Sequence, residues 1–200
     1  MGYGATGIAG ETDSDLSCVP AFLIQFLDLG FLISRLNIIR SMSTAPFHII
    51  AADHTGITVS NLERSLAFWR DVLGFELSHR PHQTGDLASE ITGVPGAEIS
   101  IAVLKGYGHK IELLEYLAPP DRKHVDIRPC DVGSVHVALL VDDLDAVLNT
   151  IKASGWKAAG KAQTLKSGPN AGKLVVYVRD PDGITIEFMQ PPPDLTPKLA

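Results

Sequence analysis

Four ionisable side chains interrupt apolar segments of this 200-residue chain: His54, Glu112, His136 and Glu187. A lone histidine or glutamate in a strand usually lies at an edge or satisfies one hydrogen bond, and that is the default for each residue alone. Here a histidine from an early segment and a glutamate from a late segment recur in both halves of the chain. Two buried carboxylates that face each other need a compensating cation. The recurrence therefore predicts a divalent metal site.

Two imidazole nitrogens and two carboxylate oxygens suit Ni, Co, Zn, Mn or Fe(II), with water completing the shell. Such an ion polarises a carbonyl or enolate oxygen while a carboxylate at its edge removes a proton from the neighbouring carbon. We expect His54 and His136 to bind as neutral imidazoles. Glu112 and Glu187 would complete the site, and one of them, Glu187 in the first instance, would loosen to act as the base. This chemistry predicts an isomerase, epimerase or lyase acting on a small carbonyl or carboxylate compound.

The elements that position these residues follow one order twice. In the first half, the segment from Asp53 to Val59 reads as a strand, and Ser60 with Glu63 has the spacing of a capping box. An apolar face at three- and four-residue intervals then predicts a helix that ends at Gly74. Strands are expected at Phe75–His79, Glu98–Leu104 and His109–Tyr116.

Laying His54 on His136 also places Val59 on Val141 and Leu62 on Leu144, so the chain contains an internal repeat of about 60 to 70 residues. The second unit begins with a strand and a helix capped by Asp142 or Asp143. Its further elements are a helix stop at Gly155 and strands at Trp156–Ala159, Lys173–Arg179 and Gly183–Met189, the last two joined by the tight turn Asp180-Pro181-Asp182-Gly183.

We expect three parts in the chain. Residues 1–46 form an N-terminal extension with an amphipathic helix from about Pro20 to Arg40, which would lie on the domain or on a partner subunit. Met42 is an alternative natural start. Residues 47–192 form the domain, with modules at 47–118 and 131–192, and residues 193–200 are a C-terminal tail.

Composition excludes several partners. The 17 basic and 23 acidic side chains give a formal charge of −6, which argues against nucleic acid or an anionic membrane surface as a partner. The apolar stretch from Val19 to Ile39 contains Asp28 and Arg35, so no membrane span is expected. Two distant cysteines, Cys18 and Cys130, fit free thiols in a reducing compartment, and we expect a cytoplasmic protein.

From about residue 49 to 192 the chain resembles the vicinal oxygen chelate superfamily, which includes glyoxalase I, methylmalonyl-CoA epimerase, extradiol dioxygenases and the bleomycin and fosfomycin resistance proteins. The resemblance is carried by the following segments: His54–Leu62, Phe68-Trp69, Leu73-Gly74-Phe75, Ile111-Glu112-Leu113, His136-Val137-Ala138, Val141–Leu144 and Asp180–Phe188. It implies an α+β fold in which two βαβββ modules form a cupped mixed sheet around a metal cleft. It also implies a homodimer, and it places the metal ligands at the four residues named above.

Within that superfamily the sequence looks closest to methylmalonyl-CoA epimerase and glyoxalase I. The segment after Gly74 lacks the usual glutathione-contacting pattern, and Glu90 and Glu98 are both available as the epimerase's second catalytic glutamate. Two alternatives remain open. An extradiol dioxygenase would use His54, His136 and Glu187 on Fe(II), although Glu112 would crowd that arrangement. A small-molecule binding protein of the resistance type would act without catalysis.

One basic cluster lies near the junction between the modules. Lys123, His124 and Arg128 could hold a carboxylate or phosphate of the substrate. A solvated linker is the simpler interpretation of these three residues, and the sequence alone does not decide between the two.

Overall fold

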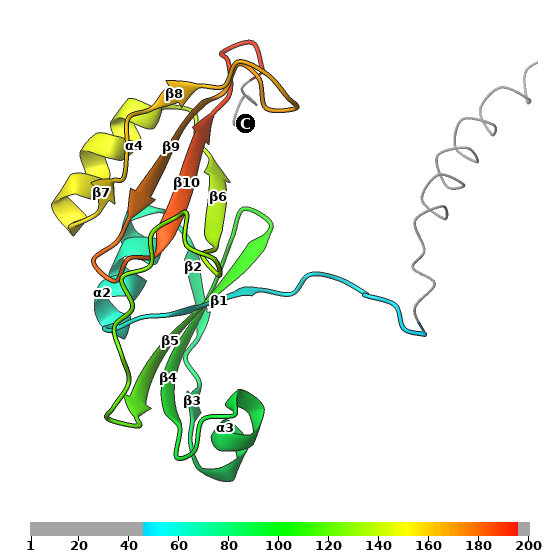
Figure 1. The fold of residues 1–200 in the computed structure, drawn as a ribbon, viewed down its shortest axis with the longest axis vertical. Helices are drawn as coiled ribbons and strands as arrows, with labels where there is room; N and C mark the ends of the chain where they lie inside the picture. The colour runs from blue at the N-terminus through cyan, green and yellow to red at the C-terminus, as the bar shows by residue number, and fades with distance from the viewer. Residues whose placement is uncertain (1–45, 196–200) are drawn as a thin grey trace, which may run out of the picture. The chain divides into compact units, whose positions relative to one another are not determined.

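The computed structural model describes residues 46–195, drawn in colour in Figure 1. The helix expected from Pro20 to Arg40 and the alternative start at Met42 lie outside the described residues. The chain separates into two units, residues 1–51 and 52–200, and the described part of the first contains no helix or strand. No helix between residues 46 and 195 is both long and apolar enough to cross a bilayer.

The first module forms a five-stranded sheet with the spatial order β1-β5-β4-β2, and β3 also pairs with β4. The first strand of the module, β1, runs parallel to its last strand, β5, while the other neighbours are antiparallel. Its elements are β1 (Thr55–Thr58), α2 (Leu62–Ala67) continued by the π-helical turn Phe68–Val72, β2 (Glu76–His79), β3 (His82–Gln83), α3 (Gly85–Thr92), β4 (Glu98–Gly106) and β5 (His109–Ala118).

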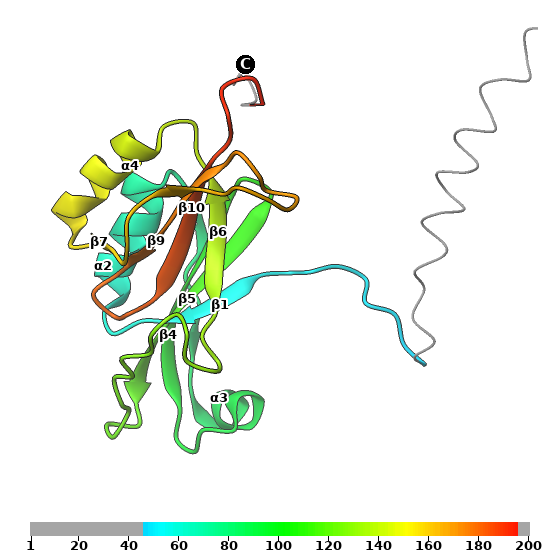
Figure 2. The ribbon, with the colours of Figure 1, turned by 45° about the horizontal axis from the view of Figure 1, so that its top comes forward.

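The second module repeats this plan with the spatial order β6-β10-β9-β7, and β8 also pairs with β9. Again the first strand, β6, lies parallel to the last, β10. The elements are β6 (His136–Leu140), α4 (Leu144–Ile151) followed by a 3-10 turn, β7 (Lys157–Ala158), β8 (Gln163–Thr164), β9 (Leu174–Arg179) and β10 (Thr185–Gln190). The expected α+β fold of two βαβββ modules is confirmed, and Figure 2 shows the two sheets in a second view.

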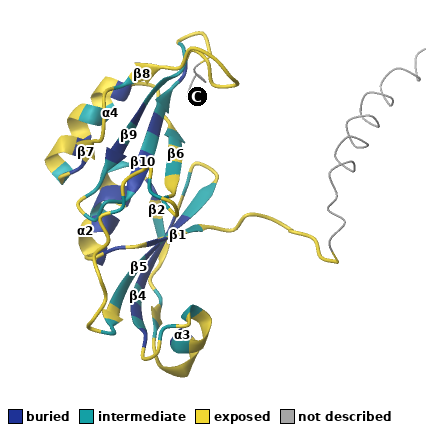
Figure 3. Ribbon diagram, in the orientation of Figure 1, coloured by how far each residue is buried: buried dark blue, intermediate teal, exposed yellow. Residues whose placement is uncertain are grey.

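Both helices that follow the first strands pack into one shared apolar core. Phe68, at the end of α2, stacks on Trp156 of the second module with ring centroids 3.9 Å apart and planes 19° from parallel. In Figure 3 α2 and α4 carry buried residues on one side and exposed residues on the other. The residues of both modules that are buried in this core include Ile57, Leu62, Leu66, Trp69, Leu113, Leu144, Ile151, Val178, Ile186 and Phe188.

The helix caps follow the repeat, with one correction. Ser60 was the predicted cap of α2, but the residue in that position is Asn61, whose side chain accepts from the backbone N–H of Arg64 at 2.8 Å. Ser60 instead binds Asp182 of the second module, with its N–H at 2.9 Å and its hydroxyl at 2.6 Å. In the second module Asp143 is the cap, as one of the two predicted alternatives.

Each module also caps its helix from its own last strand. Glu115 of β5 accepts from the backbone N–H of Leu62 at 2.8 Å, and Gln190 of β10 accepts from that of Leu144 at 2.8 Å. Both acceptors lie three residues after a candidate site glutamate. The strand that carries the glutamate is therefore locked to the helix on its other face, which fixes the direction in which the glutamate points.

The helix α3, which was not predicted from the sequence, lies on the opposite face of the first sheet from α2. Ala88 and Ala97 pack there against Ile99, Ile101 and Val103 of β4 in a second, smaller core. The helix exposes Leu87 and Ile91, so its sequence lacks the continuous apolar face that identifies an amphipathic helix. No helix lies at the corresponding place in the second module, whose sequence between β7 and β9 contains β8 instead.

The junction between the modules is electrostatic as well as apolar. Arg64 of α2 contacts Asp182 at 2.5 Å, beside the two bonds from Ser60. Burial alone would raise the pKa of Asp182, but the bonds from Ser60 and Arg64 hold that pKa below its usual value. The neighbouring Asp180 accepts from the N–H groups of Asp182 and Ile184 at 2.8 and 2.7 Å, and burial raises its pKa to about 6.

The shared core predicts that Trp156→Ala destabilises the whole domain, since it removes the partner of Phe68 and leaves a cavity. We expect a loss of about 3–5 kcal/mol in the free energy of unfolding, measured by urea titration. Leu87→Ala, on the exposed face of α3, is the control and should change that free energy by less than about 0.5 kcal/mol. Equal losses in the two variants would contradict a common core centred on this contact.

Asp180 predicts a pH dependence of stability. Its pKa is higher in the folded chain than the ordinary 3.8, so folding favours the neutral carboxyl and stability falls as pH rises through that interval to about 6. Asp180→Asn keeps an oxygen that accepts both N–H bonds but does not titrate. The melting temperature of this variant should therefore fall less than that of the unmodified chain between about pH 4 and 7. Asp121→Asn, which neutralises an exposed carboxylate, should leave the profile unchanged.

Candidate functional site

The first candidate pair joins the two parallel strands of the first module. His54 lies directly before β1, and Glu112 lies in β5 opposite Gly56. His54 Nε2 and Glu112 Oε2 are 3.3 Å apart, and the Glu112 side chain is 24% exposed. Ile111 and Leu113, on either side of Glu112, are buried in the shared core. Because side chains alternate along a strand, Glu112 points to the sheet face opposite α2.

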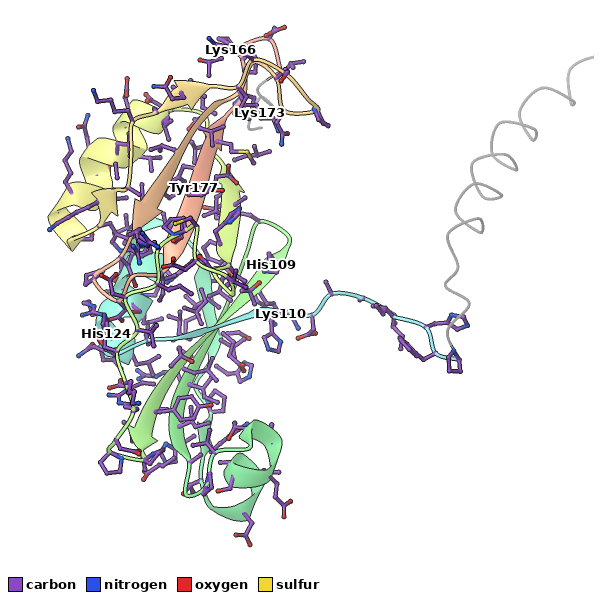
Figure 4. All side chains as sticks on the ribbon, viewed as in Figure 1. His109, Lys110, His124, Lys166, Lys173 and Tyr177 are labelled. Atoms are coloured by element: carbon purple, nitrogen blue, oxygen red, sulfur yellow. The ribbon has the colours of Figure 1, made fainter. Side chains whose placement is uncertain are left out.

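A carboxylate that was not predicted from the sequence contacts His54 at Nδ1, the ring nitrogen that does not face Glu112. Asp53 Oδ1 lies 2.8 Å from His54 Nδ1, and its other oxygen accepts from Lys110 Nζ at 2.6 Å. The hydrogen bond from Lys110 and then that with His54 lower the pKa of Asp53. His109 completes this edge through a 2.9 Å contact between its Nε2 and the Thr55 hydroxyl (Figure 4). Asp53 therefore holds the ring so that Nε2 faces Glu112.

The second candidate pair has the same construction. His136 opens β6, Glu187 lies in the parallel strand β10, and their Nε2 and Oε2 atoms are 3.2 Å apart. Ile186 and Phe188, on either side of Glu187, are buried in the shared core. Glu187 thus also points away from the helices. The position before His136 is occupied by Val135, so this histidine has no neighbour equivalent to Asp53.

Tyr177 is a further residue of the second pair that the sequence analysis missed. It lies opposite Glu187 in the antiparallel pairing of β9 with β10, and its ring centroid is 5.0 Å from that of His136. Burial, followed by the charge of Glu187, raises the pKa of the Tyr177 phenol, so the phenol stays protonated at neutral pH. The alternation of Tyr177 with the buried Val176 and Val178 would have been the signal in the sequence.

The donor set of each pair fits a divalent cation. A neutral imidazole that donates Nδ1–H to Asp53 presents a lone pair to Glu112, and a lone pair facing a carboxylate is repulsive unless a proton or a cation lies between them. Ligand atoms about 2.1 Å from a common ion are about 3.0–3.4 Å apart in octahedral and tetrahedral geometry. The observed separations of 3.3 and 3.2 Å lie in that interval.

The four residues form two separate pairs in the described chain. Within residues 46–195, no three histidine, cysteine, aspartate or glutamate side chains gather into a group that could hold a metal ion. The shared core is consistent with this arrangement, because residues of α2 and α4 are buried in it and each glutamate lies on the sheet face opposite its helix. The convergence of all four residues on one ion is thus not achieved within a single copy of residues 46–195.

The other sequence candidates lie away from both pairs. Glu98 contacts His82 at 3.2 Å, and Glu90 is an exposed residue of α3. Arg128 pairs with Asp131 at 2.6 Å, which removes it from the predicted basic cluster. Lys123 and His124 line a cavity of about 370 Å³ next to the end of β1.

Comparison with known proteins finds similarity to one family, to two enzymes and to a solved structure. The family model described as Glyoxalase/Bleomycin resistance protein/Dioxygenase superfamily matches residues 51–188. A 2-epi-5-epi-valiolone epimerase from Actinomyces sp. is 33% identical over 72% of this chain and 80% of its own length. A lactoylglutathione lyase from Haemophilus influenzae is 29% identical over 68% of this chain and 90% of its own length. The crystal structure of a glyoxalase family protein from Bacillus cereus aligns with a TM-score of 0.64 and 25% identity, covering 74% of this chain and 98% of that one.

Proposed function

The chain belongs to the Glyoxalase/Bleomycin resistance protein/Dioxygenase superfamily, and on that premise we propose that it is a divalent-metal-dependent enzyme. Its reaction would be the isomerisation, epimerisation or lyase cleavage of a small carbonyl or carboxylate compound. The observation that supports this proposal is the duplicated histidine–glutamate pair, with 3.3 and 3.2 Å between the facing atoms, at the same place in both modules. The relatives named epimerase and lyase at about 30% identity are consistent with it.

His54, Glu112, His136 and Glu187 would hold the ion, which when bound supplies a Lewis acid for an oxygen of the substrate. Asp53 orients His54 by accepting from its Nδ1–H. Glu187, with 17% of its side chain exposed, would take the proton from the carbon next to the carbonyl. Epimerisation would need a proton delivered to the opposite face by a second acid, for which Glu112 is the candidate, whereas return of the proton from Glu187 to the adjacent carbon would give isomerisation. Loss of a leaving group from the adjacent carbon gives the lyase reaction.

A second copy of the chain would complete the site. Within residues 46–195 of one copy the two pairs do not gather into one group, and the Phe68–Trp156 stack and the bonds from Ser60 and Arg64 to Asp182 hold the modules in that arrangement. Two copies related by a two-fold axis can instead place the His54–Glu112 pair of each against the His136–Glu187 pair of the other, which yields two equivalent sites. The exposed open side of β6, which includes Leu140 at 59%, gives such a partner an apolar surface.

Complementation between two inactive variants tests both the metal and its shared site. One variant carries His54→Ala with Glu112→Gln, and the other carries His136→Ala with Glu187→Gln. Each alone should lose the stoichiometric metal that elemental analysis finds in the unmodified protein. After exchange of subunits in an equal mixture, half of the dimers carry one intact site of two, so metal should return to about a quarter of the unmodified level.

The same mixture should recover deuterium exchange from solvent into a carbonyl substrate. If the mixture remains metal-free while the unmodified protein binds metal, all four ligands come from one copy and the shared site is wrong. Bound iron with oxygen consumption on a catechol would favour the dioxygenase. Absence of stoichiometric metal from the unmodified protein would favour a binding protein.

Asp53 yields a separate prediction about metal affinity. Asp53→Ala removes the acceptor that orients His54 and should weaken Co(II) or Ni(II) binding about 10- to 100-fold in a chelator competition. Asp53→Asn, which keeps an uncharged acceptor, should give a smaller loss. Val135→Ala, at the equivalent position before His136, is the matched control and should leave the affinity unchanged. An unaltered affinity in Asp53→Ala would show that this carboxylate does not position the ligand.

A further inference from the structure

We propose that the cavity beside the linker between the modules binds an anionic group, a phosphate or carboxylate, at the far end of the substrate. This inference rests on the proposed function for the identity of the ligand as a substrate, but the binding itself does not require a metal. The cavity has a volume of about 370 Å³ and is lined by Thr58 and Ser60 near the end of β1, Tyr116 of β5, and the linker residues Arg122, Lys123 and His124. It thus combines two cations and a histidine with hydroxyl groups.

The basic side chains of this cavity have no partners in the described chain. Each of the other five arginines between residues 46 and 195 forms an ion pair with a carboxylate: Arg64, Arg70, Arg80, Arg128 and Arg179. Arg122, Lys123 and His124 form no hydrogen bond or ion pair with any described residue. Three adjacent unpaired donors that face one cavity are suited to an anion, because a guanidinium group can hold two oxygens of a phosphate or carboxylate at once.

The one carboxylate that lines the cavity is already neutralised. Asp182 receives the N–H and hydroxyl of Ser60 and lies 2.5 Å from Arg64, with its side chain only 8% exposed. Its charge is therefore balanced from the side that faces α2. An incoming anion would meet the linker cations without a free carboxylate opposite them.

The linker is attached to the second module just beyond the cations. The Arg179 guanidinium donates to the backbone carbonyl of Ile127 and, at 3.0 Å, to that of Gly183. Arg128 then binds Asp131 through its backbone and side chain. The Arg179 bonds tie the linker to the β9–β10 turn, which also carries Asp182, and the Arg128–Asp131 bonds fix the linker's own fold. Residues 122–124 are thus held next to the cavity, and Figure 4 shows His124 near the end of β1 where α2 begins.

A second cavity lies between this site and one candidate metal ligand, His136. It has a volume of about 240 Å³, is lined by Gly56 and His136, and shares Thr58 and Asp182 with the first cavity. Gly56 and Thr58 of β1, together with His54 directly before it, point to the same face of the sheet. Four residues of strand span about 13 Å, which is the separation of His54 from Thr58. The same number of residues separates Glu112 from Tyr116 in β5. A substrate with its reactive carbonyl near His54 and an anionic group about 13 Å away along β1 would therefore reach the linker cations.

Binding of inorganic phosphate to the full chain tests the site without substrate or metal. After removal of metal on a chelating resin, phosphate should cause saturable shifts in the backbone amide signals of Thr58, Ser60 and residues 122–125. Arg122→Gln with Lys123→Gln should weaken this binding about tenfold or more. Lys161→Gln with Lys166→Gln removes the same charge from the segment between β7 and β9, and it should leave the affinity unchanged.

Acetate in place of phosphate distinguishes the two anions, and the tighter of the two identifies the group that the substrate carries. His136→Ala with Glu187→Gln should bind phosphate as the unmodified chain does, so a failure of the metal site does not affect this result. The proposal would be overturned by shifts that never saturate. It would also be overturned if the Arg122→Gln, Lys123→Gln variant and the Lys161→Gln, Lys166→Gln variant lost phosphate affinity equally. Either outcome would show only general attraction between the anion and surface cations.

Discussion

The contact on which the other features depend is the stacking of Phe68 on Trp156 within the core that α2 and α4 share. Each module buries one sheet face against its own helix, and the buried residues of both modules join in one core. The opposite face of each sheet remains available for chemistry. Because the glutamates lie on that opposite face, the packing that stabilises the chain also keeps the two candidate pairs apart. The four-ligand site that we propose would then need a second copy, and the bonds from Ser60 and Arg64 to Asp182 hold the two modules in this arrangement.

Each pair places an imidazole nitrogen next to a carboxylate oxygen. In the first module the Nδ1–H of His54 is directed at Asp53, so the 3.3 Å contact of its Nε2 with Glu112 calls for a proton or a cation between the two atoms. In the second module the corresponding atoms of His136 and Glu187 are 3.2 Å apart. The two histidines have different neighbours. His54 is held by Asp53 and indirectly by Lys110, whereas His136 lies beside the aromatic ring of Tyr177. One half therefore orients its ligand through charge, and the other half places a neutral phenol beside the expected base.

Much of the fold could be predicted because it depends on local patterns. The spacing of Leu62, Leu66 and Trp69 identified a helix with one buried face, and the repeat assigned the same plan to both halves. The cap at Ser60 was wrong because its true partner, Asp182, lies far along the chain and no local rule reveals it. The histidine and glutamate of each half could be paired from the repeat, since parallel neighbours share a register. The position of one half relative to the other could not be predicted, because it depends on how Phe68 and Trp156 pack.

Gly56 lines the same cavity as His136, and its lack of a side chain leaves space there. Its backbone conformation is open to other residues, but a Cβ at this position would lie 3.5 Å from a methyl group of Leu114, at ordinary contact distance. Alanine would fit, whereas any longer side chain would enter the space that Gly56 lines. At Gly56 the lining is formed by main-chain atoms of a hydrogen-bonded strand, which do not change rotamer. In the site that we propose, this part of the wall would be rigid, whereas the cations of the linker lie on long, adaptable side chains.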